Sequence, residues 1–130
     1  MAINLDRPRY SYDIDIFHDS EAAVAAAFAA DHQCLIDAGY EVDIGRDHPT
    51  MITARVSRDG LDTSVDWVRD SSVRFFPVIA SDRLGYTLHP FDLATNKALA
   101  AAARREPRDA VDLVHLHETY LPLGPIAWAA

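Results

Sequence analysis

The sequence predicts an α+β fold, in which helices pack on one face of a mixed β-sheet and a helical extension follows at the C-terminal end. Residues 10–17 alternate polar and apolar side chains in their second half, which is typical of a half-buried strand. An alanine-rich run over residues 21–38 favours a helix. Several strand-like segments follow this helix before the chain becomes helical again, and this order of elements indicates the α+β class.

The first predicted strand presents two carboxylates side by side. Asp13 and Asp15 are two residues apart, so they point to the same face of a strand, about 7 Å apart along the backbone. Ile14 and Ile16 point to the other face, where they would anchor the strand in a core. Like charges so placed repel unless a cation lies between them, and Mg²⁺ usually takes one or two carboxylates. The stretch therefore predicts either a magnesium site or a surface strand with two solvated aspartates.

The predicted helix has clear signals at both ends. Ser20 is expected to be its N-cap, and Gly39 is placed to end it. The apolar residues that recur at helical spacing, and that should form its buried side, are Val24, Phe28 and Leu35. Cys34 lies within the same helix and is expected to serve only in packing.

Further strands are predicted after the helix. The segments with strand-like patterns are residues 40–44, 51–57, 62–68, 73–79 and 84–88. Asp59-Gly60 lies between the second and third of these and favours a tight hairpin turn. Asp66 is a third carboxylate, in a strand that is otherwise apolar on one side.

The character of the chain changes at His89-Pro90. Proline suits the first turn of a helix, and Pro107 opens a second helix that should end near Tyr120. The apolar residues 125–130 resemble the beginning of a further helix. We therefore expect a core in residues 1–88 and a helical extension in residues 89–130, within the same compact unit.

Composition limits the classes of function. A chain of 130 residues with 49% hydrophobic and 25% charged residues is typical of one soluble globular domain. The net charge of -8 argues against nucleic-acid binding by overall charge, although a local basic patch is compatible with it. The single cysteine rules out an internal disulfide and favours the reducing cytoplasm. No apolar run has the length of a membrane span, so no membrane partner is expected.

The acidic strand residues suggest phosphoryl chemistry. Asp13, Asp15 and Asp66 form a set suited to holding a divalent metal against a triphosphate, and one carboxylate would assist deprotonation of an attacking hydroxyl. Phosphoryl transfer also needs a cation near the phosphates. Lys97 is the only lysine among 12 basic residues and would supply it. In that role, Lys97→Ala should weaken triphosphate binding with little loss of stability. Alternatively, Lys97 is a solvated helix lysine. Asp109 would then complement the positive end of the second helix.

These motifs together carry a resemblance to a known family. They are Arg9-x-Ser11-x-Asp13-Ile14-Asp15-Ile16-Phe17, the later strand aspartate Asp66, Asp92-Leu93-Ala94-x-x-Lys97-x-x-Ala100, and Arg108-Asp109-x-x-Asp112-Leu113. In this order and spacing they resemble the AbiEii/AbiGii toxin family of the polymerase-beta-like nucleotidyltransferase superfamily. The resemblance covers residues 9–117.

The resemblance implies a function and a site. It implies a nucleotidyltransferase-like sheet, Mg²⁺, a nucleoside triphosphate donor, an RNA acceptor such as tRNA or a protein acceptor, and a cognate antitoxin partner. It makes Asp13 and Asp15 the metal ligands and Asp66 the third catalytic carboxylate. The residues that it implies in substrate binding are Ser11, Lys97, Arg108, Asp109 and Asp112.

One motif of the family is missing. The family pattern has a Gly-Gly or Gly-Ser turn upstream of the aspartate strand, where backbone amides cradle the triphosphate. Residues 1–8 contain no glycine. This departure indicates a truncated or degenerate member, and it supports the alternative function of a catalytically inactive, nucleotidyltransferase-like binding module.

Overall fold

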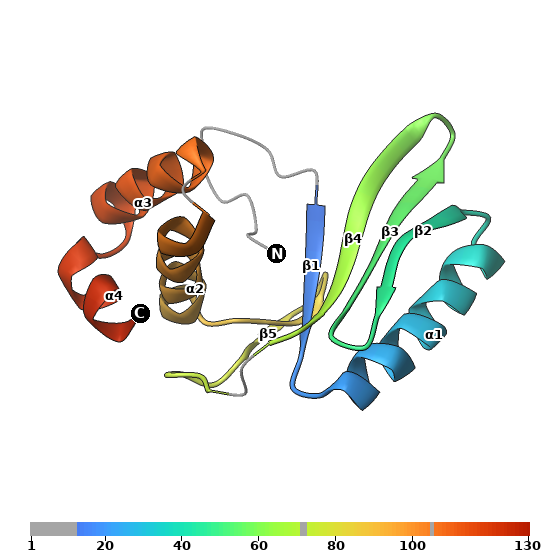
Figure 1. Ribbon diagram of the computed structural model, residues 1–130, viewed down its shortest axis with the longest axis horizontal. Helices are drawn as coiled ribbons and strands as arrows, with labels where there is room; N and C mark the ends of the chain where they lie inside the picture. The colour runs from blue at the N-terminus through green and yellow to red at the C-terminus, as the bar shows by residue number, and fades with distance from the viewer. Residues whose placement is uncertain (1–12, 71–72, 105) are drawn as a thin grey trace. The chain divides into compact units, whose positions relative to one another are not determined.

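The computed structural model describes residues 13–70, 73–104 and 106–130 (Figure 1). The chain divides into two compact units, Met1–Val73 and Arg74–Ala130. Within the described residues, the first unit holds a four-stranded mixed sheet and one helix, and the second holds a two-stranded sheet and three helices. The predicted α+β class is therefore confirmed.

The sheet of the first unit places the first strand beside the last. Its strands are β1 (Asp13–His18), β2 (Glu41–His48), β3 (Met51–Arg58) and β4 (Leu61–Arg69), in the order β1-β4-β3-β2. The pair β1–β4 is parallel, whereas β2–β3 and β3–β4 are antiparallel. The predicted strand at residues 13–17 is confirmed, and residues 10–12 lie outside the described part of the chain.

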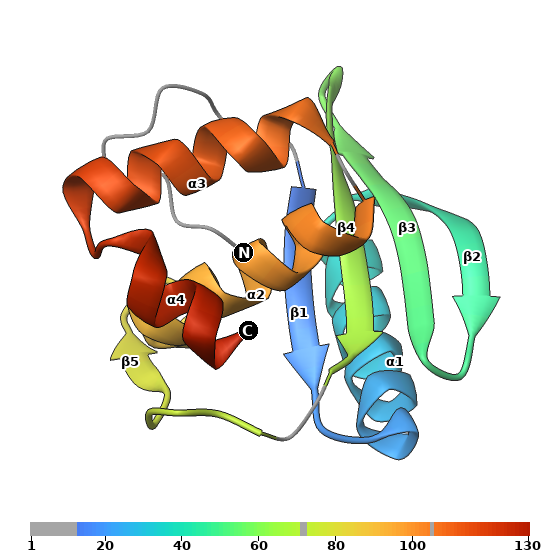
Figure 2. The same cartoon turned by 60° about the vertical axis from the view of Figure 1, so that its left-hand side comes forward.

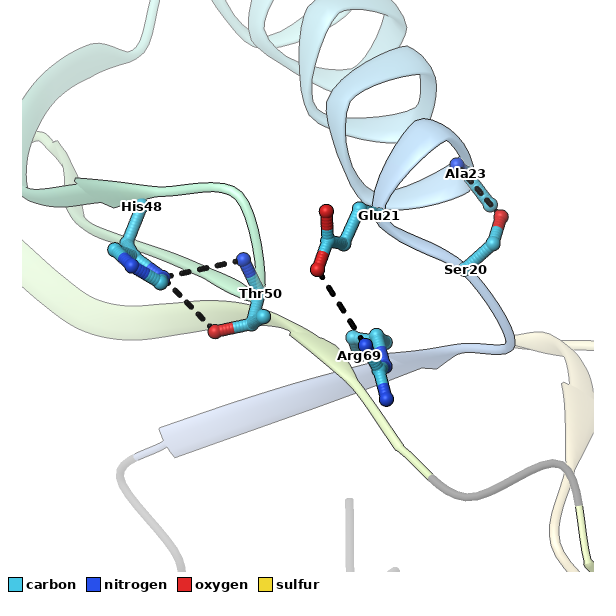
Figure 3. A network of polar contacts seen from close by, with 6 residues as sticks. All are labelled: Ser20, Glu21, Ala23, His48, Thr50 and Arg69. Atoms are coloured by element: carbon cyan, nitrogen blue, oxygen red, sulfur yellow. Dashed lines mark hydrogen bonds and ion pairs between the residues drawn. The ribbon is translucent and has the colours of Figure 1, made fainter.

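Helix α1 (Glu21–Asp37) begins and ends as its sequence predicts. The Ser20 hydroxyl accepts a hydrogen bond from the Ala23 amide at 3.2 Å, so Ser20 is the N-cap (Figure 3). Arg69 of β4 contacts Glu21 in the first turn at 3.4 Å, which ties the end of the sheet to the start of the helix. Gly39, with a φ of 80°, follows the C-terminal end, as expected.

Helix α1 covers one face of the sheet (Figure 2). Val24 is fully buried, and the predicted stripe is completed by Phe28 and Leu35, which are half-buried against the core. Trp67 of β4 is 1% exposed, and its ring meets that of Phe28 edge-on with centroids 5.1 Å apart. The Trp67 indole nitrogen donates to the Asp31 carboxylate at 2.8 Å, so its one polar atom is satisfied inside the core.

The β3–β4 hairpin turns where the sequence predicts. Asp59 and Gly60 have φ values of 53° and 78°, the left-handed pair that a two-residue hairpin turn requires. The same hairpin sets the register in which Asp62 pairs with Ser57 and Asp66 with Thr53. This register decides which β4 side chains share a face with those of β3.

The second unit has one short hairpin and three helices. Its elements are β5 (Ile79–Ser81), β6 (Gly85–Thr87), α2 (Pro90–Arg104), α3 (Pro107–Thr119) and α4 (Leu123–Ala129). The predicted helix starts at Pro90 and Pro107 are confirmed. Of the strand predicted over residues 73–79, only the last residue, Ile79, lies in a strand, because β5 begins there. No helix of the described residues is long and apolar enough to cross a membrane.

A buried carboxylate explains why residues 75–76 do not form a strand. Asp92, which is 5% exposed, accepts hydrogen bonds from the Phe75 amide at 2.8 Å and from the Phe76 amide at 3.2 Å. These amides therefore bond to a side chain instead of to a neighbouring strand. Asp92 also joins this segment to α2, so the structure divides the chain after Val73, earlier than the sequence-based boundary at residue 88.

Candidate functional site

The structure brings Asp13, Asp15 and Asp66 onto one face of the four-stranded sheet. Asp13 and Asp15 alternate along β1 with Ile14 and Ile16, which pack against the core under α1. In the parallel β1–β4 pair, Asp15 lies directly beside Asp66. Directly paired residues of neighbouring strands point to the same side of a sheet, so the three carboxylates share the face opposite α1. We call this the carboxylate face.

The pKa of Asp66 is shifted by burial and by the charged groups around it. Burial raises the pKa of Asp66 above its ordinary value, while the Ser64 hydroxyl, which donates to Asp66 at 3.3 Å, lowers it. The negative charges of Asp15 and Asp13 raise the Asp66 pKa further, and the positive charge of Arg46 lowers it. The net shift is upward. Asp66 therefore senses both β1 carboxylates and one cation, all within the first unit.

Arg46 is a residue of this face that the sequence analysis missed. It follows a β-bulge in β2, where the pairing with β3 skips Gly45. Ile44 pairs with the core residue Ala54, whereas Arg46 pairs with Thr53, which in turn pairs with Asp66. Without the extra residue, Arg46 would point to the same side as Ile44. The predicted strand ends at Ile44, whereas β2 continues through Gly45 to His48. A glycine within a strand is a signal of a bulge, so continuing the predicted strand through Gly45 would have indicated it.

Close packing explains why glycine suits the bulge. A Cβ atom at position 45 would lie 3.3 Å from the Thr53 hydroxyl oxygen and 3.8 Å from the Thr53 carbonyl oxygen. The first distance is tighter than most Cβ contacts, so a side chain at position 45 would require the Thr53 hydroxyl to shift by a few tenths of an ångström. Glycine avoids this shift.

The second unit brings together another set of predicted residues, Lys97, Asp109 and Asp112. The Lys97 ammonium lies 2.9 Å from an Asp112 oxygen and 3.4 Å from an Asp109 oxygen. The side chains of Lys97, Asp109 and Asp112 are 22%, 0% and 6% exposed. The interpretation of Lys97 as a solvated helix lysine is therefore wrong, because it bridges α2 to two buried carboxylates of α3. Asp109 does more than complement the helix dipole, for the same reason.

Two predicted site residues remain, Ser11 and Arg108. Ser11 lies outside the described residues, as does the segment 1–8 that lacks the glycine turn. Arg108 lies exposed in the first turn of α3. The predicted site residues thus form two groups, one in each unit, and only the first group contains neighbouring strand carboxylates.

The donor set of the carboxylate face suits Mg²⁺. Carboxylate oxygens are hard ligands, and Mg²⁺ needs only one or two of them when water and phosphate complete its shell. Among the residues that the structure describes, no group of three or more His, Cys, Asp or Glu side chains is arranged to hold a metal. The sequence motifs assign only two of these carboxylates, Asp13 and Asp15, to the metal, and water and phosphate would complete its shell.

No protein-family model, no curated protein and no solved structure matches the chain. The resemblance to the AbiEii/AbiGii nucleotidyltransferases thus rests on the quoted sequence motifs alone.

The raised pKa of Asp66 leads to a prediction for the metal-free protein. Because folding raises this pKa, ionised Asp66 opposes folding, and this penalty grows as the pH rises through the folded-state pKa. Asp66→Asn should therefore increase the free energy of unfolding at pH 7, by at most about 1 kcal/mol after solvent screening. The gain should shrink towards pH 3, where Asp66 is protonated in both states.

Urea denaturation at pH 7 and at pH 3, without divalent metal, would check this result. Asp47→Asn is the matched control, because it makes the same charge change at an exposed position of β2. A gain of equal size in both variants would indicate a general effect of net charge instead of a local effect at the carboxylate face.

Proposed function

We propose that this chain is a magnesium-dependent nucleotidyltransferase, which moves a nucleotide from a nucleoside triphosphate to an RNA acceptor such as tRNA or to a protein. The observation that supports it most is the carboxylate face, where Asp15 of β1 lies directly beside Asp66 of β4 and Asp13 lies two residues away. The mutual influence of these charges on Asp66 supports the same proposal. The motif order of the sequence supplies the reaction class.

Each carboxylate has a distinct task in this proposal. Asp13 and Asp15 would hold Mg²⁺, which when bound neutralises phosphate charge and polarises phosphoryl oxygens. Asp66 would accept the proton of the attacking hydroxyl, because burial, the largest influence on this carboxyl group, raises its pKa. The Ser64 hydroxyl would orient the Asp66 carboxylate through the 3.3 Å hydrogen bond. Isoleucines on the opposite face of β1 fix the strand that carries the pair.

The partners in this proposal follow from the resemblance. A toxin of this class would act in the cytoplasm on an RNA acceptor and would be restrained by a cognate antitoxin protein. The net charge of -8 makes tight RNA binding through overall charge unfavourable. RNA recognition would therefore depend on local contacts near the transferred nucleotide.

Transfer of a labelled nucleotide tests the proposed reaction. The protein would be incubated with tRNA, Mg²⁺ and each of the four α-³²P-labelled ribonucleoside triphosphates. We expect incorporation that requires Mg²⁺ and disappears in Asp13→Asn with Asp15→Asn, because these two aspartates would hold the metal against the triphosphate. Incorporation that persists in this double variant would contradict the assigned roles of the two aspartates.

A second candidate function is a catalytically inactive binding module. The observation that favours it is the environment of Lys97, whose ammonium contacts Asp109 and Asp112 within the second unit. A lysine so held is a poorer phosphate ligand, because a phosphate must compete with two carboxylates. Magnesium and triphosphate binding without any transfer to tRNA or to a protein acceptor would favour the inactive module.

A further inference from the structure

We propose that Arg46 is the anion-binding residue of the carboxylate face, placed there by the bulge at Gly45 to hold the phosphate groups of a magnesium-bound triphosphate. This inference rests on the proposed function, since it takes the carboxylate face as the metal site. It adds a substrate-positioning residue from β2, a strand that contributes none of the motifs of the sequence analysis.

The sheet register places Arg46 in one row with two of the carboxylates. Arg46, Thr53, Asp66 and Asp15 are successive partners on β2, β3, β4 and β1. They form one row across the sheet, so their side chains leave it on the same side. Arg46 and Asp66 start two strand spacings apart, about 10 Å. A long arginine side chain at one end of the row thus faces carboxylates at the other, across the short side chain of Thr53.

The bulge at Gly45 directs the Arg46 side chain to the carboxylate face. Val42 and Ile44 alternate on the core side of β2, and regular alternation would send the next even position to that side as well. The register shift at Gly45 reverses this direction for Arg46. Bulges that redirect one side chain are frequent beside active sites.

Arg46 differs in its contacts from the other described arginines of the first unit. Among the described residues of this unit, ion pairs join Arg55 to Asp62, Arg58 to Asp59, and Arg69 to Glu21. Among the described residues, Arg46 forms no such pair, and its side chain donates instead to the Met51 sulfur at 3.2 Å. A thioether is a weak acceptor, so the guanidinium keeps most of its hydrogen-bonding capacity. Its charge nevertheless reaches Asp66.

A magnesium-bound triphosphate has groups that would bind at both ends of this row. Magnesium on the aspartates would bind some phosphate oxygens, and the guanidinium would bind others. The planar fork of arginine matches the geometry of phosphate oxygens and gives charge-assisted hydrogen bonds. Lys97, the cation that the sequence suggested for this task, already contacts Asp109 and Asp112. The chemistry of the carboxylate face therefore points to Arg46 as its phosphate ligand.

The test compares triphosphate binding by matched arginine variants. The probe is inorganic tripolyphosphate with excess Mg²⁺, measured by calorimetry on the full chain, with Mg²⁺-induced thermal stabilisation measured in parallel. Arg46→Gln should weaken tripolyphosphate binding at least about tenfold and leave the magnesium response in place. Arg46→Lys keeps the charge without the fork and should bind with intermediate affinity. Arg46 is exposed, so these variants should fold, which circular dichroism would check.

Arg55→Gln is the control, because Arg55 lies on the same face of β3 but pairs with Asp62 at 3.3 Å. It should bind tripolyphosphate as the wild type does. Equal affinity of the wild type and Arg46→Gln would overturn the inference, as would an equal loss in Arg55→Gln. A wild-type magnesium response without tripolyphosphate binding contradicts this inference alone. An absent magnesium response contradicts the proposed function, and this inference with it.

Discussion

Replacing Lys97 with alanine is expected to lower the free energy of unfolding by about 3 kcal/mol. The substitution removes the ammonium that lies 2.9 Å from Asp112 and 3.4 Å from Asp109, while both carboxylates stay buried. Breaking a buried ion pair by removing one partner is strongly destabilising, because the remaining charge loses its compensation. We expect the lower end of the usual range, because the Lys97 side chain is 22% exposed. Alanine itself favours the helix and so does not add to the loss.

Urea denaturation followed by circular dichroism of the helices would measure this effect. Arg108→Ala is the matched control, since it removes an exposed cation from the first turn of α3 and should change stability by less than about 0.5 kcal/mol. Lys97→Met combined with Asp109→Asn and Asp112→Asn should recover much of the loss, because no buried charge then remains in the cluster. A Lys97→Ala protein as stable as the wild type would mean that the cluster contributes little to the second unit.

Local patterns predicted much of the first unit. The hydroxyl of Ser20, the glycine at position 39 and the Asp59-Gly60 pair act within a few residues of their own position, so the sequence alone indicates what they do. Alternation along β1 likewise assigned Asp13 and Asp15 to the polar side of a strand. These features need no knowledge of which distant segments meet.

The neighbours of each strand could not be predicted in this way. The adjacency of Asp15 and Asp66 depends on the parallel pairing of β1 with β4, whose residues are about 50 positions apart in the chain. Sequence alternation places a residue on a face but does not say which strand lies beside it. The Lys97 contacts are non-local in the same sense, although the spacing of Asp109 and Asp112 already put both on one side of their helix.

Arg46 shows how one residue of irregularity changes the assignment. Read with a strict period of two, β2 would place Arg46 with Val42 and Ile44. The bulge at Gly45 moves it to the carboxylate face, and Asp92 similarly prevents the strand expected at residues 75–76. In both places a local departure from regular pairing, invisible to a periodic pattern, determines where the chemistry-bearing groups lie.

Thermal unfolding with and without the metal tests most directly whether Asp13 and Asp15 hold Mg²⁺. A ligand that binds only the folded state stabilises it by about 2.7 kcal/mol at one hundred times its dissociation constant. Titration with Mg²⁺ should therefore raise the Tm of the wild type steadily. Asp13→Asn with Asp15→Asn should abolish this response, because it removes the two carboxylates that would hold the ion.

Asp47→Asn with Asp59→Asn is the matched control for this measurement. Both residues are exposed, and the double variant makes the same change in net charge away from β1, so it should keep the full magnesium response. The Tm should rise with Mg²⁺ in the wild type and in the control. It should stay constant in Asp13→Asn with Asp15→Asn. A wild type without a response, or an equal response in all three proteins, would contradict the assignment of Mg²⁺ to these two aspartates.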